Sequence, residues 1–433
     1  MKIFRYPSKT AKKKIEAIIN RGLAFKKKDV QDVTRIIEDV RKNGDKAVLK
    51  YTRKFDAPGM KTDMLVVTEK EIKDASKQVD RSFVRALNRA AANIETFHKK
   101  QVGRSWISTE RDGVFIGQMV NPVNAAGIYV PGAIGGKTPL VSSVLMGGIP
   151  AKIAGVKHIA MVTPPAKDNT INPHLIVAAK KAGIDRIYKT GSAWAVAALA
   201  YGTKTVQKVD VIAGPGNIYV TIAKKLLAGT IGIDMIAGPS EILVIADKNA
   251  NPGFIAADLL SQAEHDPMAS AVLVTDSKMM ADAVSKEISI QINRLDRQDI
   301  AAQSLADYGL IAVVPDIQKA IKIANRVAPE HLELMIENPF EYINMIKHAG
   351  AVFMGDYTPE PVGDYMAGPN HVLPTAGTAR FASALSVEHF TKKTSLIHYS
   401  EDAFMKEALD IIRLAEIEGL GAHAESVRIR LNK

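Results

Sequence analysis

The chain has 433 residues, of which 47% are hydrophobic and 24% charged, and it contains no cysteine. This composition is that of a globular protein large enough for two or more packed domains, and the absence of cysteine excludes disulfides, thiolate nucleophiles and iron–sulfur clusters. The formal net charge of +11 raises the question of a nucleic-acid partner. Lys12–Lys14 and Lys26–Lys28 lie in polar helical segments without interleaved aromatic residues, so we expect a solvated lysine-rich surface and no nucleic-acid binding.

The N-terminal residues predict no targeting signal, because residues 1–7 contain no apolar run of the kind that a signal peptide has. Residues 114–136 are long and uncharged, as a membrane span would be. They are interrupted by Gln118, Asn121, Pro122 and several glycines, a pattern typical of strands and turns. We therefore expect a cytoplasmic protein without a membrane segment.

Helices come first along the chain, followed by alternating strands and helices. Residues 29–55 and 70–102 carry apolar positions at helical spacing, with a break at Asn43-Gly44. From about residue 124, short apolar runs predict strands at 127–130, 158–162 and 210–212. The segments between and after them predict helices at about 142–155, 172–183, 192–202 and 216–228. Alternation of this kind favours a parallel sheet.

A second set of strands is predicted at 241–245, 270–274 and 310–314, again with helices between them. The predicted fold is therefore α/β, with two Rossmann-like parallel-sheet domains that lack a G-x-G-x-x-G fingerprint, plus small helical N- and C-terminal segments. A last helix beyond Phe404 is expected to end near Gly419 and Gly421, leaving a short tail that holds His423.

The predicted domain boundaries follow from this alternation. Residues 1–22 form an N-terminal helical segment, residues 23–121 and 240–377 form a first α/β domain, residues 122–239 form an inserted second α/β domain, and residues 378–433 form a C-terminal helical segment.

Gln262 and His265 are three residues apart in a segment patterned as a helix, so their side chains are expected on one face. An amide oxygen and an imidazole nitrogen side by side could form half of a zinc site, since zinc accepts N and O donors when no thiolate is present. A Gln and a His on one helix face are more often surface or core residues than metal ligands.

Glycine-rich turns follow several predicted strands. Pro131–Thr138 is similar to a phosphate-binding P-loop, but it has three residues where the motif has four before Gly-Lys. The turns at 214–217 and 237–240 can be ordinary Gly-Pro turns, or they can line a ligand site at the strand ends of an α/β sheet.

Two more segments carry acid–base groups. Glu330 and His331 are adjacent after Pro329, where they form either the first turn of a helix or a pair that divides acid–base work in a pocket. The loop at 363–371 holds Asp364 and His371. Spacing alone permits, without requiring, a zinc site of Gln262, His265, Asp364 and His423.

Taken together, these segments resemble the histidinol dehydrogenase family over nearly the whole chain. The resemblance rests on several long matches in the same order: Gly127–Gly132, Ala197–Thr203, Gly214–Val220, Ile233–Glu241, Ser261–His265, Pro329–Leu332 and Gly368–Thr375. It implies an NAD-dependent zinc enzyme that oxidises L-histidinol to L-histidine through L-histidinal, with the transfer of four electrons, at the end of histidine biosynthesis. It also implies a homodimer with shared active sites.

The same resemblance assigns roles to individual residues. Glu330 and His331 match the acid–base pair, and the residues that match the ligands of one zinc per subunit are Gln262, His265, Asp364 and His423, the last contributed to the partner subunit's site. The resemblance implies that the substrate is contacted by the four zinc ligands and also by His331, Ser240, His371 and Glu418. The implied contacts with the cofactor are Tyr129, Asn217 and Trp194. Zinc would position the substrate's imidazole and amine against the nicotinamide.

One position departs from the family pattern. The chain has Gly191-Ser192-Ala193-Trp194-Ala195 where the family usually carries Gly-Gly-Ala-Gln-Ala, and an indole offers an N–H and a stacking face but no acceptor. Two alternatives stay open: a relative that oxidises another small alcohol, such as a sulfonated diol, and a zinc-binding protein without enzymatic activity.

Overall fold

The computed structural model describes residues 1–22, 25–132 and 139–431, so most of the P-loop-like turn, residues 133–138, lies outside the described chain. These residues form two compact units, Met1–Gln101 with Asn124–Phe390 and Val102–Val123 with Thr391–Lys433. Within the described ranges, no helix is long and apolar enough to cross a membrane.

The first unit contains a six-stranded parallel sheet in the order β1-β11-β10-β9-β12-β13. Its strands are β1 (Ile3–Arg5), β9 (Glu241–Ala246), β10 (Ser270–Thr275), β11 (Leu310–Val313), β12 (His331–Met335) and β13 (Ala351–Met354). Side chains alternate across it: Ile242 and Val244 belong to one apolar core, and Leu243 and Ile245 to another on the opposite face.

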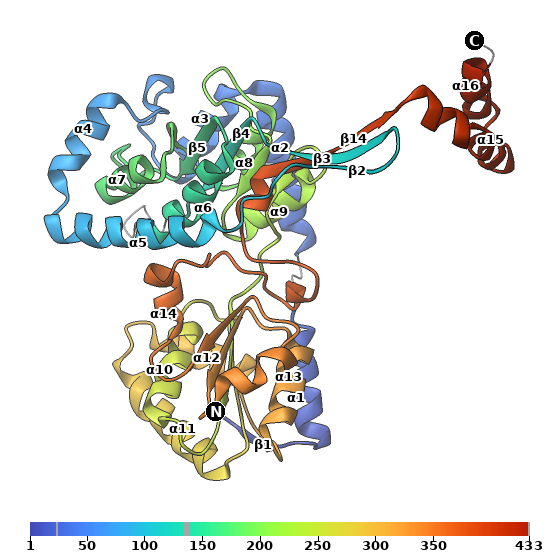
Figure 1. The fold of residues 1–433 in the computed structure, drawn as a ribbon. Helices are drawn as coiled ribbons and strands as arrows, with labels where there is room; N and C mark the ends of the chain where they lie inside the picture. The colour runs from blue at the N-terminus through green and yellow to red at the C-terminus, as the bar shows by residue number, and fades with distance from the viewer. Residues whose placement is uncertain (23–24, 133–138, 432–433) are drawn as a thin grey trace. The chain divides into compact units, whose positions relative to one another are not determined.

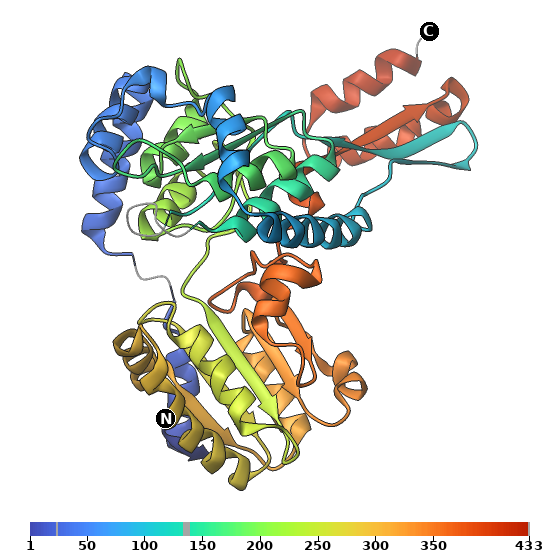
Figure 2. The ribbon, with the colours of Figure 1, turned by 90° about the vertical axis from the view of Figure 1, so that its left-hand side faces the viewer.

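Helices cover both faces of this sheet. On one face lie α10 (Pro252–Ala263), α11 (Lys278–Gln291) and α12 (Gln298–Tyr308), and on the other lie α1 (Lys9–Ile19) and α13 (Ile317–Val327). In both views the blue N-terminal segment, β1 and α1, lies among the yellow and orange elements of this sheet (Figures 1 and 2). Residues from both ends of the sequence therefore complete one core.

A second parallel sheet has the order β6-β5-β4-β7-β8. Its strands are β4 (Ala125–Tyr129), β5 (His158–Thr163), β6 (Arg186–Lys189), β7 (Val211–Ala213) and β8 (Gly232–Ile233), and its helices are α6 (Val141–Ala154), α7 (Pro173–Ala182), α8 (Ser192–Tyr201) and α9 (Ile218–Leu227). This order repeats β11-β10-β9-β12-β13 of the first sheet. The prediction of an α/β protein with two similar parallel-sheet halves is confirmed.

The N-terminal helices pack differently from what the sequence suggested. Helices α2 (Lys27–Asn43) and α3 (Asp45–Phe55) share a core with α8, α9 and the second sheet, whereas we expected them to complete the half formed by residues 240–377. Both faces of the first sheet are already covered, by α1 and α13 on one side and by α10, α11 and α12 on the other, which leaves no face of that sheet for α2 and α3. The helices α4 (Glu69–Gln78) and α5 (Arg81–Lys99) follow. The domain boundaries themselves remain predictions.

The second unit is a three-stranded antiparallel sheet, β14-β3-β2, with two helices (Figure 1). Its elements are β2 (Trp106–Arg111), β3 (Val114–Pro122), β14 (Thr391–Tyr399), α15 (Glu401–Ile417) and α16 (Gly421–Leu431). The expected tail after residue 421 is wrong, as is an entirely helical C-terminal segment. Gly419, with φ of 72°, breaks the helix, and a new helix carries His423 in its first turn.

A buried ion pair fixes the turn after β7. Lys224 of α9 forms an ion pair with Asp234, the two side chains being 3% and 0% exposed, and donates to the Gly214 carbonyl oxygen at 3.0 Å. The Asp234 carboxylate accepts from the Gly214 N–H at 2.7 Å. The pair therefore connects α9, the 214–217 turn and the segment after β8.

Replacing Lys224 with Met should lower the free energy of unfolding by about 3–5 kcal/mol, because the Asp234 carboxylate would stay buried without its cation. Urea unfolding followed by circular dichroism measures the change. Lys181→Met, at an exposed position of α7, is the matched control and should stay within about 0.5 kcal/mol of the wild type. Equal stability of the two variants would contradict this account.

Candidate active site

The predicted acid–base residues, Glu330 and His331, lie at the amino end of β12, beside the amino end of the adjacent parallel strand β9. Glu241 opens β9 and His331 opens β12, with His331 beside Ile242 in the register. The reading of residues 328–332 as a helix start is wrong, because α13 ends at Val327 and Ala328 takes a left-handed conformation (φ 53°) before β12 begins. The amino edge of this sheet therefore carries the candidate chemistry.

Glu241 holds Glu330 in place through reciprocal hydrogen bonds. The Glu330 N–H donates to Glu241 Oε2 at 3.2 Å, and the Glu241 N–H donates to Glu330 Oε2 at 3.0 Å. Arg21 donates to the other Glu241 oxygen at 2.8 Å, and both side chains are nearly fully buried. The Glu330 carboxyl group is thus held by the backbone of the neighbouring strand.

The hydrogen bonding of His331 defines its tautomer. Its Nδ1 lies 2.9 Å from the Glu241 carbonyl oxygen, which can only accept, so Nδ1 carries the proton. The Nε2 atom then has a free lone pair and lies 3.7 Å from Glu360 Oε1. Burial lowers the pKa of His331 to about 4, so the imidazole is neutral at neutral pH and Nε2 is available as a base.

Buried carboxyl groups crowd around this imidazole. Burial raises the pKa of Glu330 well above its ordinary value, that of Glu360 to about 8 and that of Glu333 to about 9, with neighbouring carboxylates adding to each shift. Glu333 Oε1 accepts from the Glu360 N–H at 3.2 Å, while its buried Oε2 has no hydrogen-bond partner within the described part of the chain. A cation bound beside these buried carboxyl groups would stabilise their ionised forms.

The donor groups fit a divalent metal ion of the zinc type. Ligand atoms of His331, Glu360 and Asp364 all lie within 4.8 Å of one another. Gln262 is fully buried, and its amide nitrogen, turned toward Glu360, donates to Oε2 at 2.9 Å and Oε1 at 3.2 Å. A set of imidazole, carboxylate and amide donors is one that zinc accepts in the absence of thiolates.

The structure brings some predicted metal ligands to this cluster. Asp364 belongs to it, and His371 Nδ1 lies 3.6 Å from Asp364 Oδ1. His265 lies just beyond Glu264, the residue that ends α10, and its backbone N–H donates to the Gln262 carbonyl oxygen at 3.2 Å. It is near enough to His331 and Asp364 to contribute, after burial, to the electrostatic environment of both groups.

Of the other predicted substrate contacts, Ser240 lies at the amino edge of the first sheet, whereas Glu418 and His423 lie in the second unit. Ser240 immediately precedes β9, and its carbonyl oxygen accepts from the Ser270 N–H at 3.0 Å. Glu418 ends α15 and His423 lies in α16, so both belong to the second unit.

Four residues of the site were missed by sequence reasoning: Arg21, Glu241, Glu333 and Glu360. Glu241 and Glu333 do carry a signal, since each is an acid at or inside an otherwise apolar strand, EILVIA and HLELM. A carboxylate in such a run is either paired or functional. Arg21 and Glu360 stand in polar segments where the sequence gives no such contrast.

The predicted cofactor contacts gather at the other sheet. Tyr129 ends β4, Asn217 follows β7, and the strand order of this sheet reverses between these two strands, which is where open α/β sheets bind ligands. A cavity of about 450 Å³ there is lined by residues that include Ser192, Trp194 and Asn217, and the Ser192 N–H donates to the Tyr129 hydroxyl at 2.9 Å.

Trp194 forms an apolar wall of this cavity. It is 4% exposed and lies near the rings of Tyr51 and Phe55, with centroid distances of 5.8 and 5.4 Å. Its indole N–H donates to Thr52 Oγ1 at 3.1 Å. The only donor of this side chain is therefore used within the protein.

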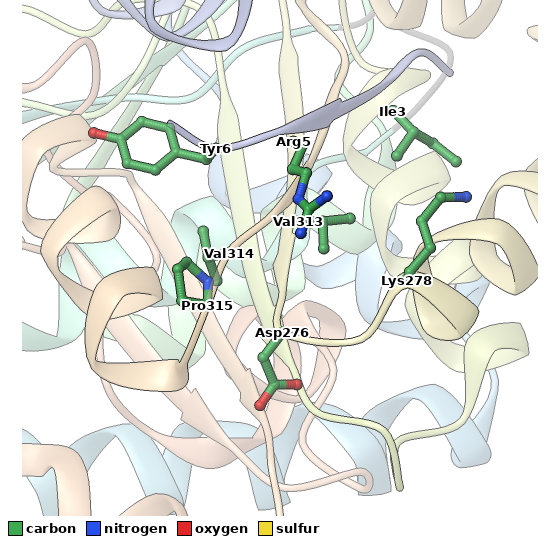
Figure 3. Close-up of a pocket in the computed structure, with 8 residues that line it drawn as sticks. All are labelled: Ile3, Arg5, Tyr6, Asp276, Lys278, Val313, Val314 and Pro315. Carbon is green, nitrogen blue, oxygen red and sulfur yellow. The ribbon is translucent and has the colours of Figure 1, made fainter. Parts of the chain in front are cut away.

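A separate cavity of about 750 Å³ lies at the carboxyl edge of the first sheet. Figure 3 shows its lining by Arg5, Tyr6, Asp276, Lys278 and their apolar neighbours. None of the predicted site residues lines it. In the first sheet, the candidate chemistry is thus at the edge opposite to this cavity.

Comparisons with known proteins agree with these features. Residues 20–431 match the family model described as histidinol dehydrogenase. The chain is 53% identical over 417 residues to the histidinol dehydrogenase of Desulfotalea psychrophila, covering 96% of each, and 54% identical over 400 residues to that of Oleidesulfovibrio alaskensis, covering 92% of each. The crystal structure of histidinol dehydrogenase from Elizabethkingia anophelis superposes with a TM-score of 0.93 at 39% identity, covering 100% of this chain and 98% of that one.

The raised pKa of Glu333 predicts a pH-dependent stability. The folded protein keeps this proton up to about pH 9, whereas the unfolded chain releases it near pH 4.5, so the stability is present below about pH 4.5 and is lost as the pH rises through about 9. Glu333→Gln resembles the protonated form. It should therefore match the wild type at pH 4.5 and exceed its free energy of unfolding by about 2–4 kcal/mol at pH 8.

Urea unfolding with a chelator present, at pH 4.5 and pH 8, measures this difference. Glu341→Gln, a change at an exposed position, serves as control and should behave as the wild type at both values. A Glu333→Gln protein that is no more stable at pH 8 would contradict the protonation of Glu333.

Proposed function

The chain belongs to the histidinol dehydrogenase family and is an oxidoreductase of histidine biosynthesis that oxidises histidinol, and from this premise we propose that it uses zinc and NAD to convert L-histidinol to L-histidine through L-histidinal. The activity rests on the family match over 412 residues, 20–431. The proposed mechanism rests on one observation, the neutral His331 whose Nε2 faces a cluster of metal-ligand side chains.

Zinc, when bound, would position the imidazole and amine of the substrate, and NAD, when bound, would accept one hydride in each of the two oxidations. The residues we propose to hold zinc are Gln262, His265, Asp364 and His423. Glu360 lies among them and supplies a carboxylate in contact with Gln262. The acids of the cluster support a cation there, because burial and then the repulsion between neighbouring carboxylates raise their pKa values, and a cation would offset both effects.

His331 is proposed as the base of the first step. Its Nε2 accepts the proton of the substrate hydroxyl while a hydride leaves the carbon that carries this hydroxyl, which gives the aldehyde. The Nδ1–H bond to the Glu241 carbonyl oxygen keeps the ring oriented. Glu360, whose Oε1 lies 3.7 Å from Nε2, would stabilise the imidazolium that forms, acting as a carboxylate once a bound cation has lowered its raised pKa.

Glu330 is proposed to prepare the second oxidation. As a carboxylate it takes a proton from water while the oxygen of that water adds to the aldehyde carbon, and the former carbonyl oxygen takes the proton that His331 gained in the first step, which gives a hydrate and restores the neutral imidazole. Bonds between the strands fix its position. A divalent cation nearby would lower the pKa of Glu330 from its raised value, because it offsets the repulsion from Glu241 and Glu360.

We further propose that the enzyme is a homodimer in which His423 and Glu418 complete the site of the partner subunit. Both residues are exposed in the second unit, as is expected of groups that act on a neighbour. The remaining proposed contacts with the substrate are Ser240, Gln262, His265, His331, Asp364 and His371, and the proposed cofactor contacts are Tyr129, Trp194 and Asn217.

Purified protein with zinc and NAD should release two NADH for each L-histidinol consumed, with histidine as the product. Absorbance at the NADH band together with chromatographic detection of histidine measures this ratio. A panel of other small alcohols, a sulfonated diol among them, should give at least about 100-fold lower kcat/KM. Turnover of another alcohol without any of histidinol would refute the proposed substrate.

His423→Ala should lose zinc and turnover together, because a site with one of four ligands missing holds the metal less tightly. Metal analysis after dialysis measures zinc per subunit. Ser426→Ala, a change on the same helix, should keep both. Mixed dimers of His423→Ala and Glu330→Ala subunits should regain activity if each site draws on two subunits, since one of the two sites is then intact. Full zinc in His423→Ala would remove this residue from the ligand set.

A further inference from the structure

Asp56 is a carboxylate that the proposed mechanism does not use. It ends α3, where its backbone N–H donates to the Thr52 carbonyl oxygen at 2.9 Å. Its side chain lines the 450 Å³ cavity together with Trp194 and Asn217. Its Oδ2 atom is buried and has no hydrogen-bond partner among the residues that the structure describes. A buried carboxylate oxygen without a donor is costly unless a ligand supplies one.

The charge of Asp56 also stands uncompensated. Burial raises its pKa to about 6, so the group is mostly ionised at pH 7.5. Arg35 and Lys54 line the same cavity, but Arg35 is bonded to Asp32 at 3.2 Å with its side chain 76% exposed, and Lys54 lies at the surface. The cations are therefore at the rim of the cavity, and the unpaired acid lies deeper.

The other residues that line the cavity restrict which ligand groups can bind to Asp56. Trp194 has already used its N–H on Thr52, and the Tyr129 hydroxyl, which accepts from the Ser192 N–H, forms no hydrogen bond with Asp56 Oδ2 in the described chain. The ligand must itself bring hydrogen-bond donors for Asp56, and it must fit against the aromatic side chain of Trp194. Its anionic part would lie toward Arg35 and Lys54.

We propose that Asp56 binds the vicinal diol of a ribose of the dinucleotide and makes the enzyme selective for NAD over NADP. Two ribose hydroxyls can donate to the two carboxylate oxygens, whereas a 2′-phosphate would place an anion against the same carboxylate. The pyrophosphate fits the cations at the rim. The inference rests on the proposed use of a nicotinamide dinucleotide and adds the residue that discriminates between the two forms.

Tryptophan fluorescence tests the proposal without relying on turnover. The sequence has two tryptophans, Trp106 and Trp194, and Trp106 lies on a strand of the second unit with 51% exposure. In a Trp106→Phe background the emission comes from Trp194 alone, in the wall of the cavity. Titration with NADH and with NADPH, followed by quenching and energy transfer, then gives two dissociation constants.

Asp56→Asn in this background should weaken NADH binding about tenfold, as expected for the loss of one charge-assisted hydrogen bond. NADPH binding should be unchanged or tighter, so the preference for NADH falls at least tenfold. Asp56→Glu, which keeps the charge, should still reject NADPH. Glu38→Gln, the same change of charge at an exposed position of α2, should leave both constants within twofold. Matching melting temperatures show that the variants are folded.

The outcomes separate this inference from the proposed function. An unaltered NADH-to-NADPH ratio in Asp56→Asn, with NADH still bound by the parent, overturns the role of Asp56 and leaves the dinucleotide-dependent function standing. A parent protein that binds neither dinucleotide at millimolar concentration overturns both.

Discussion

The buried pair of Arg21 and Glu241 is the interaction on which the site depends. Glu241 binds Arg21 through one carboxylate oxygen and the Glu330 N–H through the other, and its backbone binds Glu330 and His331. A single cation thus stabilises the acid that orients both proposed catalytic groups. Burial still raises the pKa of Glu241, and the neighbouring Arg21 offsets part of that shift.

The two sheets have the same strand order but use opposite edges. In the second sheet the cavity lies at the carboxyl ends of β4 and β7, the usual ligand position of such sheets. In the first sheet the acid–base pair and the metal-ligand cluster lie at the amino ends of β9 and β12. A duplicated architecture therefore does not imply duplicated chemistry, and the side chains at each edge decide its role.

Sequence periodicity predicted the two halves and the strand and helix positions well, because β9, β10 and α6–α9 carry dense apolar runs bounded by Gly and Pro. It missed β12 as a strand, since Pro329 and Glu330 are typical of a helix start and the register with β9 is a non-local interaction. It also missed α16, whose weak apolar pattern is stabilised by packing on α15. For the site, helical spacing suggested Gln262 and His265 as metal ligands, and the family resemblance pointed to Glu330 and His331 as the acid–base pair. The pairing of Glu241 with Arg21 joins residues 220 positions apart, which no local pattern contains.

The pairing of β1 with β11 has a consequence for synthesis on the ribosome. All elements of the second sheet, with the helices α2 and α3 that cover it, precede residue 234, so this half can assemble as soon as that length has emerged. β1, α1 and Arg21 come before this half in the chain, but β1 pairs with β11 and Arg21 with Glu241, so these pairings form only after residues 241 and 310–313 have been translated. The half that carries the acid–base pair is therefore the last to form, and its N-terminal strand and helix remain without their partners for most of translation.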